Sequence, residues 1–172
     1  MENTQGEIEN LTQQEAIEKM QELVKHNNIC LFTTRIYDSP LHARPMGTQQ
    51  VDEDGNFWFL SGDDSDKNAE IMEDNSVQLF YSDAGKAEFM SVYGQASISR
   101  DQKKIEELWN PIAKAWFKEG KNDPRLTLIK ITPEEAYYWD TKHNKMVTMI
   151  KILASMVSGK RRDDGIEGKM TL

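Results

Sequence analysis

The stretch Phe57-Trp58-Phe59-Leu60-Ser61-Gly62-Asp63-Asp64-Ser65-Asp66-Lys67 joins an aromatic run to small polar residues that end in a lysine. Its aromatic and aliphatic residues predict a buried strand over residues 57–61. Serine before a polar segment is typical of the residue that begins a helix. Two interpretations stay open. The stretch is either an ordinary turn before a helix or, because a helix N-terminus with a nearby lysine attracts anions, a seat for a phosphate.

The composition is that of a soluble, single-domain globular protein. The chain has 172 residues, of which 38% are hydrophobic and 29% charged, with a mean hydropathy of −0.70. The net charge of −8 argues against nucleic acid as the main partner, since phosphate backbones need a dense basic surface. A small anion held by one local basic pocket is compatible with that charge. Cys30 is the only cysteine, so no internal disulfide can form, which suits a reducing cytoplasm.

The ends of the chain predict no membrane segment. Residues 1–10 are polar and acidic, unlike a signal peptide, and are expected to be flexible. Residues 11–160 are expected to form the domain and residues 161–172 a polar tail. Residues 146–157 are apolar but contain a lysine and are too short to span a bilayer. The three histidines have no ligand spacing with one another or with the cysteine, so no metal site is predicted.

Short strands between turn residues dominate the pattern. Pro111 should kink or break the third of four predicted helices, in which Trp109 and Trp116 are expected to be core residues. Few helices between strands favour an antiparallel sheet that closes on itself over a doubly wound sheet. The predicted helices are 13–25, 65–74, 101–117 and 146–157, and the predicted strands are 29–36, 41–51, 57–61, 77–81, 88–99 and 126–140, the last interrupted at residues 133–135.

Arg44-Pro45-Met46 is an unusual sequence for a strand, because proline removes a hydrogen-bond donor from the ladder. In a functional interpretation, the arginine reaches a phosphate or the polar edge of a ring, and the next two residues lie against the ring. In a structural interpretation, the same residues keep an edge strand from pairing further. Both interpretations fit the sequence alone.

Several such features, taken in order, resemble the pyridoxamine 5′-phosphate oxidase-like flavin-binding split barrels, and among these the general stress protein 26 group. The resemblance covers residues 11–160 and implies a mostly β protein with flanking helices, built on a six-stranded antiparallel split β-barrel. It also implies a homodimer with FMN in the groove between subunits, FAD or another flavin being the alternative. The residues that carry it are Arg44-Pro45-Met46, Asp54 to Phe59, Ser65-Asp66-Lys67, Gly94, Leu108-Trp109-Asn110-Pro111 and Tyr138-Trp139-Asp140.

The resemblance also implies roles for individual residues. Ser61, Ser65 and Lys67 would hold the FMN phosphate. Arg44 would reach the phosphate or the polar edge of the ring, with Pro45 and Met46 along the isoalloxazine. Trp139 falls where the oxidase has a tryptophan near the flavin.

Two departures from the oxidase pattern bear on activity. Where the oxidase has an Arg-Leu-His-Asp-Arg element, this chain has Thr141-Lys142-His143-Asn144-Lys145-Met146. Where the oxidase has a basic residue in its phosphate turn, this chain has Asp66. Oxidation of pyridoxine or pyridoxamine phosphate is therefore not expected, and no catalytic residue is assigned. Three hypotheses follow: an FMN-dependent oxidoreductase of a general stress response with an unassigned small-molecule substrate, a flavin-binding sensor or store, and a barrel without ligand that serves as an interaction module.

Overall fold

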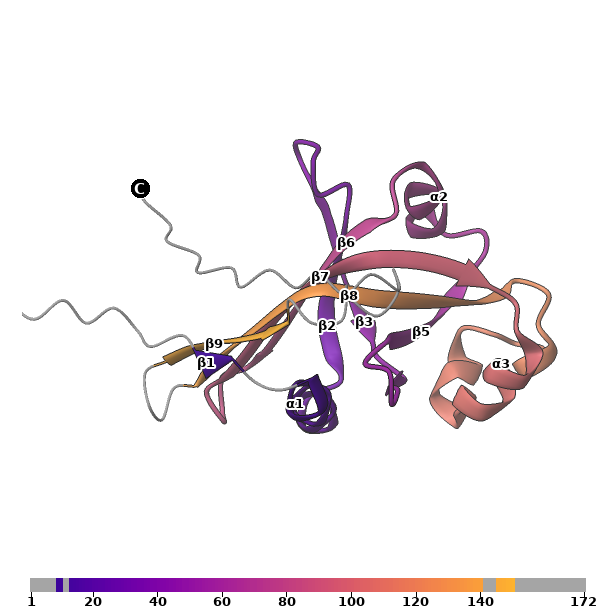
Figure 1. The fold of residues 1–172 in the computed structure, drawn as a ribbon. Helices are drawn as coiled ribbons and strands as arrows, with labels where there is room; N and C mark the ends of the chain where they lie inside the picture. The colour runs from indigo at the N-terminus through magenta and orange to yellow at the C-terminus, as the bar shows by residue number, and fades with distance from the viewer. Residues whose placement is uncertain (1–8, 11–12, 141–144, 151–172) are drawn as a thin grey trace, which may run out of the picture.

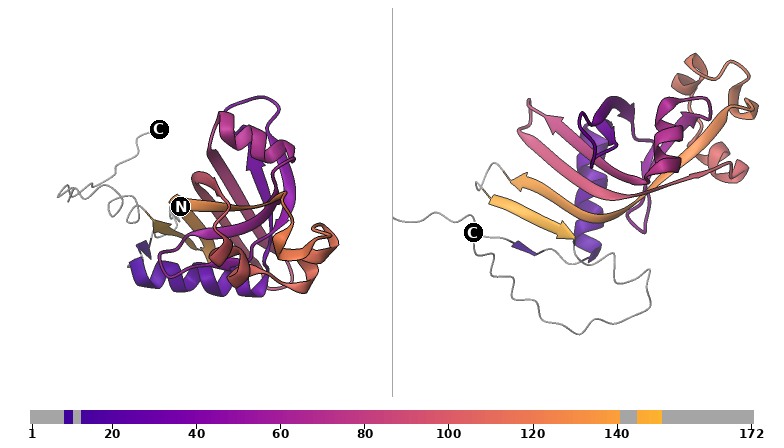
Figure 2. Two further views of the ribbon diagram at one scale, coloured as in Figure 1. Left: turned by 90° about the vertical axis from the view of Figure 1, so that its right-hand side faces the viewer. Right: turned by 90° about the horizontal axis from the view of Figure 1, so that it is seen from above.

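The computed structural model describes residues 9–10, 13–140 and 145–150. Within these ranges one curled sheet forms the body of the molecule, with the first helix packed across it and the second and third at one end (Figure 1; Figure 2). The helices are α1 (Gln13–His26), α2 (Asp66–Glu73) and α3 (Gln102–Leu108), with 3-10 turns η1 (Pro111–Ala115) and η2 (Gly120–Asn122). The strands are β1 (Glu9–Asn10), β2 (Ile29–Thr34), β3 (His42–Gly47), β4 (Gln50–Val51), β5 (Phe57–Gly62), β6 (Ser76–Asp83), β7 (Glu88–Ser99), β8 (Leu126–Asp140) and β9 (Lys145–Ile150).

The long strand β8 gives the sheet its shape. It pairs with β7 along nearly all of its 15 residues, while its first half also pairs with β5 and its second half with β9. The sheet order is β1-β9-β8-β7-β6-β2-β3, with β5 and β4 branching from β8. All pairs are antiparallel except β1–β9. The expected split barrel is confirmed, although nine strands are described instead of six, two of them only two residues long.

A bulge lets β8 continue through Pro133. The register of β7 shifts between Tyr93 and Gly94, opposite this proline, where a ladder donor is missing. A Cβ at Gly94 would lie 2.3 Å from the carbonyl oxygen of Thr132, so only glycine fits this close approach. The interruption predicted at residues 133–135 is therefore wrong, since the bulge absorbs the proline without ending the strand.

The core lies between the sheet and α1. Helix α1 buries one face with helical spacing, and β5 alternates buried with half-buried positions, so that Phe57, Phe59 and Ser61 all point inward. Phe59 meets Phe32 edge-to-face, with ring centroids 5.1 Å apart. A second, smaller cluster lies beneath α3 and η1. Because Ser61 lies on the inward face near the end of β5, its hydroxyl is buried in the interior.

Two predicted elements differ from the structure, and a third breaks where the sequence predicted. Residues 145–150 form β9 and not a helix, because the free edge of β8 offers ladder hydrogen bonds that outweigh apolar spacing; residues 151–157 lie outside the described residues. The predicted strand 41–51 divides into β3 and β4. The predicted helix 101–117 breaks at Pro111, as expected, into α3 and η1.

The break also changes which side of the segment is buried. Trp109 packs against the smaller core cluster as expected, but Trp116 is 66% exposed, so its assignment to the core is wrong. The 3-10 turn has a different period from the helix that the spacing assumed.

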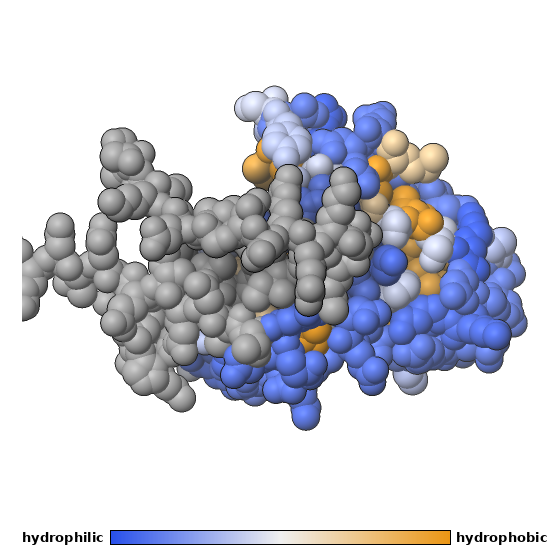
Figure 3. All heavy atoms as spheres, viewed as in Figure 1, coloured by the Kyte–Doolittle hydropathy of each residue, from blue (hydrophilic) through white to orange (hydrophobic). Residues whose placement is uncertain are grey.

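The face seen in Figure 3 is hydrophilic over most of its described surface, with hydrophobic residues gathered in a strip right of centre. None of the described helices has the length and apolar character needed to cross a bilayer.

Candidate functional site

A groove of about 890 Å³ opens at one end of the sheet. One wall is β3 with the residues after it, the floor is the end of β5 and the start of α2, and the opposite wall is η1. Figures 1 and 2 show α2 and the α3–η1 segment at this same end. Pockets of 300–1,000 Å³ are typical of cofactor and small-molecule sites. The groove therefore has the size of a nucleotide-cofactor site.

The floor of the groove is formed by the segment from Ser61 to Lys67, which we call the anion seat after the ligand class that its groups would suit. Ser65 is the N-cap of α2 in extended backbone geometry, yet its side chain does not cap the helix. The backbone N–H groups of Asp66 and Lys67 accordingly find no partner among the described residues. Such N–H groups, at the positive end of the helix dipole, are suited to bind an anion.

Lys67 lines the groove and is half-buried. Burial lowers the pKa of its ammonium group, and the nearby positive charge of Arg44 lowers it further. Both effects disfavour the charged lysine in the absence of a ligand. An anion bound beside it would reverse them, so the site gains from a negatively charged ligand.

Two of the three acidic residues of the seat are paired with arginines. Asp63 lies 2.5 Å from Arg100, and Asp64 lies 3.6 Å from Arg125. The N–H of Asp63 also donates to the carbonyl of Arg125. These pairs offset the negative charge of Asp63 and Asp64, whereas Asp66, in the first turn of α2, keeps a carboxylate close to Lys67.

A buried polar network lies under the seat. Asn68, in the first turn of α2, is 3% exposed and contacts the hydroxyls of Ser61, Ser65 and Thr127. Ser61 and Thr127 are themselves 1% and 2% exposed. The network joins β5, α2 and β8, which are adjacent only in the folded chain.

The structure places Arg44 beside the groove and not in its lining. Its guanidinium donates to Thr34 Oγ1 at 2.5 Å and to Glu70 at 2.8 Å. The Glu70 carboxylate also accepts from Thr34 and contacts His42 Nδ1. Burial raises the pKa of Glu70, but these hydrogen bonds outweigh it and hold the pKa at about 2. Arg44 is therefore paired with a carboxylate and acts on the seat through its charge.

The remaining sequence-predicted residues divide into two groups. Pro45 and Met46 line the groove together with Ser61, Ser65 and Lys67. Trp139 does not, because it lies in the half of β8 that pairs with β9, twelve residues beyond Thr127. Along a strand this is roughly 40 Å. Trp139 is 43% exposed and, within one chain, is separate from the groove.

The η1 wall was missed by the sequence analysis. Ile112 and Trp116 line the groove while 73% and 66% exposed. Asn110 holds this wall in place, accepting from the N–H groups of Ile112 and Ala113 and donating to Gln49 Oε1 at 2.5 Å. The sequence signal that could have predicted this wall is Asn110-Pro111, because asparagine favours the N-cap position and proline the first position of a helical turn.

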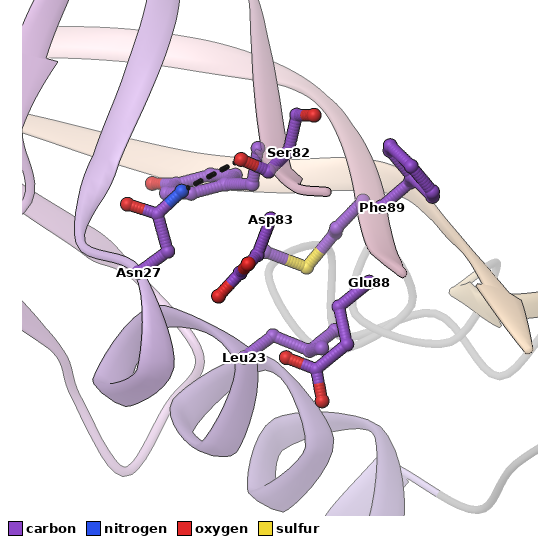
Figure 4. Close-up of a pocket in the computed structure, with 8 residues that line it drawn as sticks. Leu23, Asn27, Ser82, Asp83, Glu88 and Phe89 are labelled. Carbon is purple, nitrogen blue, oxygen red and sulfur yellow. Dashed lines mark hydrogen bonds between the residues drawn. The ribbon is translucent and has the colours of Figure 1, made fainter. Parts of the chain in front are cut away.

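A second cavity, between α1 and the β6–β7 turn, holds only about 10 Å³, room for about one water (Figure 4). Asp83 and Glu88 reach into it beside Leu23. Next to it His26 Nδ1 lies 2.9 Å from Glu88, and Glu22 completes a group whose ligand atoms lie within 4.8 Å. Because Lys19 pairs with Glu22 at 3.1 Å, a cation of the protein already balances this group.

Comparison with known proteins gives consistent matches. A family model described as pyridoxamine 5′-phosphate oxidase like matches residues 15–163. General stress protein 26 of Bacillus subtilis is 26% identical over 129 residues, which cover 73% of this chain and 89% of that protein. A related protein from Clostridium acetobutylicum has a similar structure, with a TM-score of 0.67 at 21% identity over 81% of this chain and 96% of that one. The general stress FMN/FAD binding protein of Xanthomonas citri has a TM-score of 0.63 at 28% identity over 76% and 90% of the two chains.

Proposed function

The chain belongs to the pyridoxamine 5′-phosphate oxidase-like family, and from this premise we propose that it binds a flavin nucleotide, FMN foremost, in the groove between β3 and η1. The observation that carries the proposal is the juxtaposition of an anion seat with an apolar wall in one groove of nucleotide size. The description of the Xanthomonas citri relative as an FMN/FAD binding protein supports it.

The residues present fit FMN. The phosphate would lie in the seat that Ser61, Ser65 and Lys67 shape, where two N–H groups of α2 have no partner among the described residues and a half-buried ammonium is found. The isoalloxazine would lie along Pro45 and Met46, on the wall that also carries polar side chains for the edge of the ring. Riboflavin, which lacks the phosphate, would contact the same walls but would leave the anion seat without a ligand group. The chain therefore holds FMN by its charge at one end and by apolar contact at the other.

We further propose that the protein is a flavin-dependent oxidoreductase of the general stress response, acting in the cytoplasm. FMN, when bound, supplies the electron transfer. The chain's own residues bind and orient it. The described lining of the groove contains no histidine, and three of its side chains carry a full charge. Those side chains are Asp64, Lys67 and Arg125. Without the Arg-Leu-His-Asp-Arg element, the substrate is not expected to be pyridoxine 5′-phosphate.

The partner we propose is a second copy of the chain, with the flavin at the interface. Leu31 and Phe80, which are 50% and 45% exposed, are paired in register on the outer face of β2 and β6. Pro45 stands opposite Leu31 on the other side, and Ile29, 50% exposed, lines the groove as well. This apolar face is thus continuous with the groove, so that a second copy on it would close the rim of the site.

The deciding experiment is the visible absorption spectrum of freshly purified protein, followed by titration of the apoprotein with FMN. Flavin bands with one FMN per chain are the expected result. Absence of binding at micromolar FMN would refute the proposal and favour an interaction module. Anaerobic reduction with trial donors then distinguishes an oxidoreductase, which re-oxidises with a substrate, from a sensor or store, which does not turn over.

A further inference from the structure

The buried side chain of Asn68 contacts both serines of the anion seat. We propose that Asn68 is a positioning residue: it fixes Ser61, Ser65 and the first turn of α2, so that the N–H groups of Asp66 and Lys67, and not the serine hydroxyls, meet the phosphate. The inference rests on the proposed function, which it deepens by naming how the phosphate is held. It follows from where each hydrogen in the network points.

The hydroxyl of Thr127 decides the orientation of the amide. It donates to the carbonyl oxygen of Ser61 at 2.9 Å, so its oxygen is free only to accept. The group 3.0 Å away on Asn68 must therefore be the donor Nδ2, which leaves Oδ1 to face the two serines. The amide orientation is fixed by this chain of donors and acceptors.

Both serine hydrogens are then committed to acceptors of the protein. Ser61 donates to Asn68 Oδ1 at 2.6 Å. Ser65 donates to the carbonyl of Gly62 at 2.7 Å and lies 3.1 Å from Asn68 Oδ1. A phosphate dianion only accepts hydrogen bonds, and a hydroxyl whose hydrogen is already committed offers it lone pairs instead. The donors that face the phosphate are therefore the N–H groups of α2 and the Lys67 ammonium.

Burial makes this arrangement costly to change. Ser61, Asn68 and Thr127 are each 3% exposed or less, so no bulk water replaces a lost partner. Asn68 also follows Lys67 directly in the chain, in the same first turn of α2. A loss of the amide would release the turn and the helix start together, and with them the direction of the N–H groups.

The test compares FMN with riboflavin, which lacks the phosphate, in four variants. Asn68→Ala should weaken FMN at least tenfold and change riboflavin less than twofold. Thr127→Val, nearly isosteric and outside the groove lining, should weaken FMN severalfold in the same selective way. Ser65→Ala should change FMN less than threefold. Asn75→Ala, whose amide donates to the carbonyl of Ala96 away from the groove, is the control and should change neither ligand.

Several outcomes would overturn the inference. One is an equal loss of FMN and riboflavin in Asn68→Ala, as expected of a merely structural residue. Another is a loss in Ser65→Ala as large as that in Asn68→Ala, which would make the hydroxyl the ligand. If Asn68→Ala does not fold, as judged by circular dichroism, Thr127→Val decides alone: a selective loss of FMN supports the inference, and unchanged FMN refutes it.

A titration with inorganic phosphate separates this inference from the proposed function. In ¹⁵N NMR spectra of the wild type, phosphate should shift the amide signals of Asp66 and Lys67, and Asn68→Ala should abolish those shifts. If these shifts appear but FMN does not bind, the proposed function fails and the inference holds. If phosphate leaves both signals unmoved in the wild type, the inference fails.

Discussion

Replacing Lys67 with methionine tests the anion seat most directly. Methionine keeps a long apolar stem that can pack where the lysine stem packs, and removes only the ammonium. A hydrogen bond to a charged group is worth about 1.5–3 kcal/mol. Because the lysine is half-buried, water screens it less than a surface lysine. We therefore expect FMN to bind roughly 10-fold to 150-fold more weakly.

The same substitution should not destabilise the apoprotein. Burial and Arg44 lower the pKa of Lys67 in the folded state from its ordinary value of 10.5. Folding thus disfavours the charged lysine at all pH values below that ordinary value, and methionine removes this cost. The free energy of unfolding, measured in urea at neutral pH, should be unchanged or higher.

The assay is a titration of FMN and riboflavin into the apoprotein at one fixed salt concentration. Lys86→Met, in the β6–β7 turn and outside the groove lining, removes one charge as well and serves as the control. Lys67→Met should weaken FMN alone, and Lys86→Met neither ligand. Equal losses of FMN and riboflavin in Lys67→Met would refute the phosphate assignment and favour an ordinary turn with a solvated lysine.

Two further predictions concern the assembly and the pH dependence of stability. Sedimentation equilibrium at micromolar concentration should give twice the chain mass of 19.8 kDa, and Leu31→Glu should give the single-chain mass, since it places a charge in the apolar face; a wild-type monomer would contradict this. Glu70, whose pKa is depressed to about 2 from 4.5, should stabilise the fold above pH 4.5 and lose that contribution as the pH falls towards 2. Glu70→Gln should therefore lower the free energy of unfolding at pH 6 more than at pH 3, and an equal effect at both would show that the carboxylate charge does not matter.

The local structure that the sequence predicted correctly around the site lies on consecutive residues. The strand over residues 57–61, the turn and the helix that Ser65 begins were all correct in kind, because aromatic residues, glycine and serine each favour one local geometry. Pro111 likewise marked the break between α3 and η1. Signals of this sort act over a few residues and need no knowledge of the sheet.

The rest of the site depends on residues far apart in the sequence. Asn68 and Thr127 are separated by 59 positions, and they meet because β5 pairs with the first half of β8. Arg44 was predicted to reach a ligand, but α2 brings Glu70 beside it, 26 positions along the chain. Which carboxylate faces which arginine follows from the packing of helix on strand, which composition and spacing do not specify.

The sequence by itself determined a mostly β protein, the order of its early strands and the strand–turn–helix over residues 57–74, since propensities, turns and helix caps are properties of neighbouring residues. The tertiary structure alone decided that residues 145–150 are a strand, that Trp116 lines a groove instead of the core, and that Trp139 lies at the far end of β8. Each of these depends on which edge of the sheet is free to pair or which face is left uncovered. Hydrogen-bond pairing and burial are settled between distant segments, so these features emerge only when the whole sheet has formed.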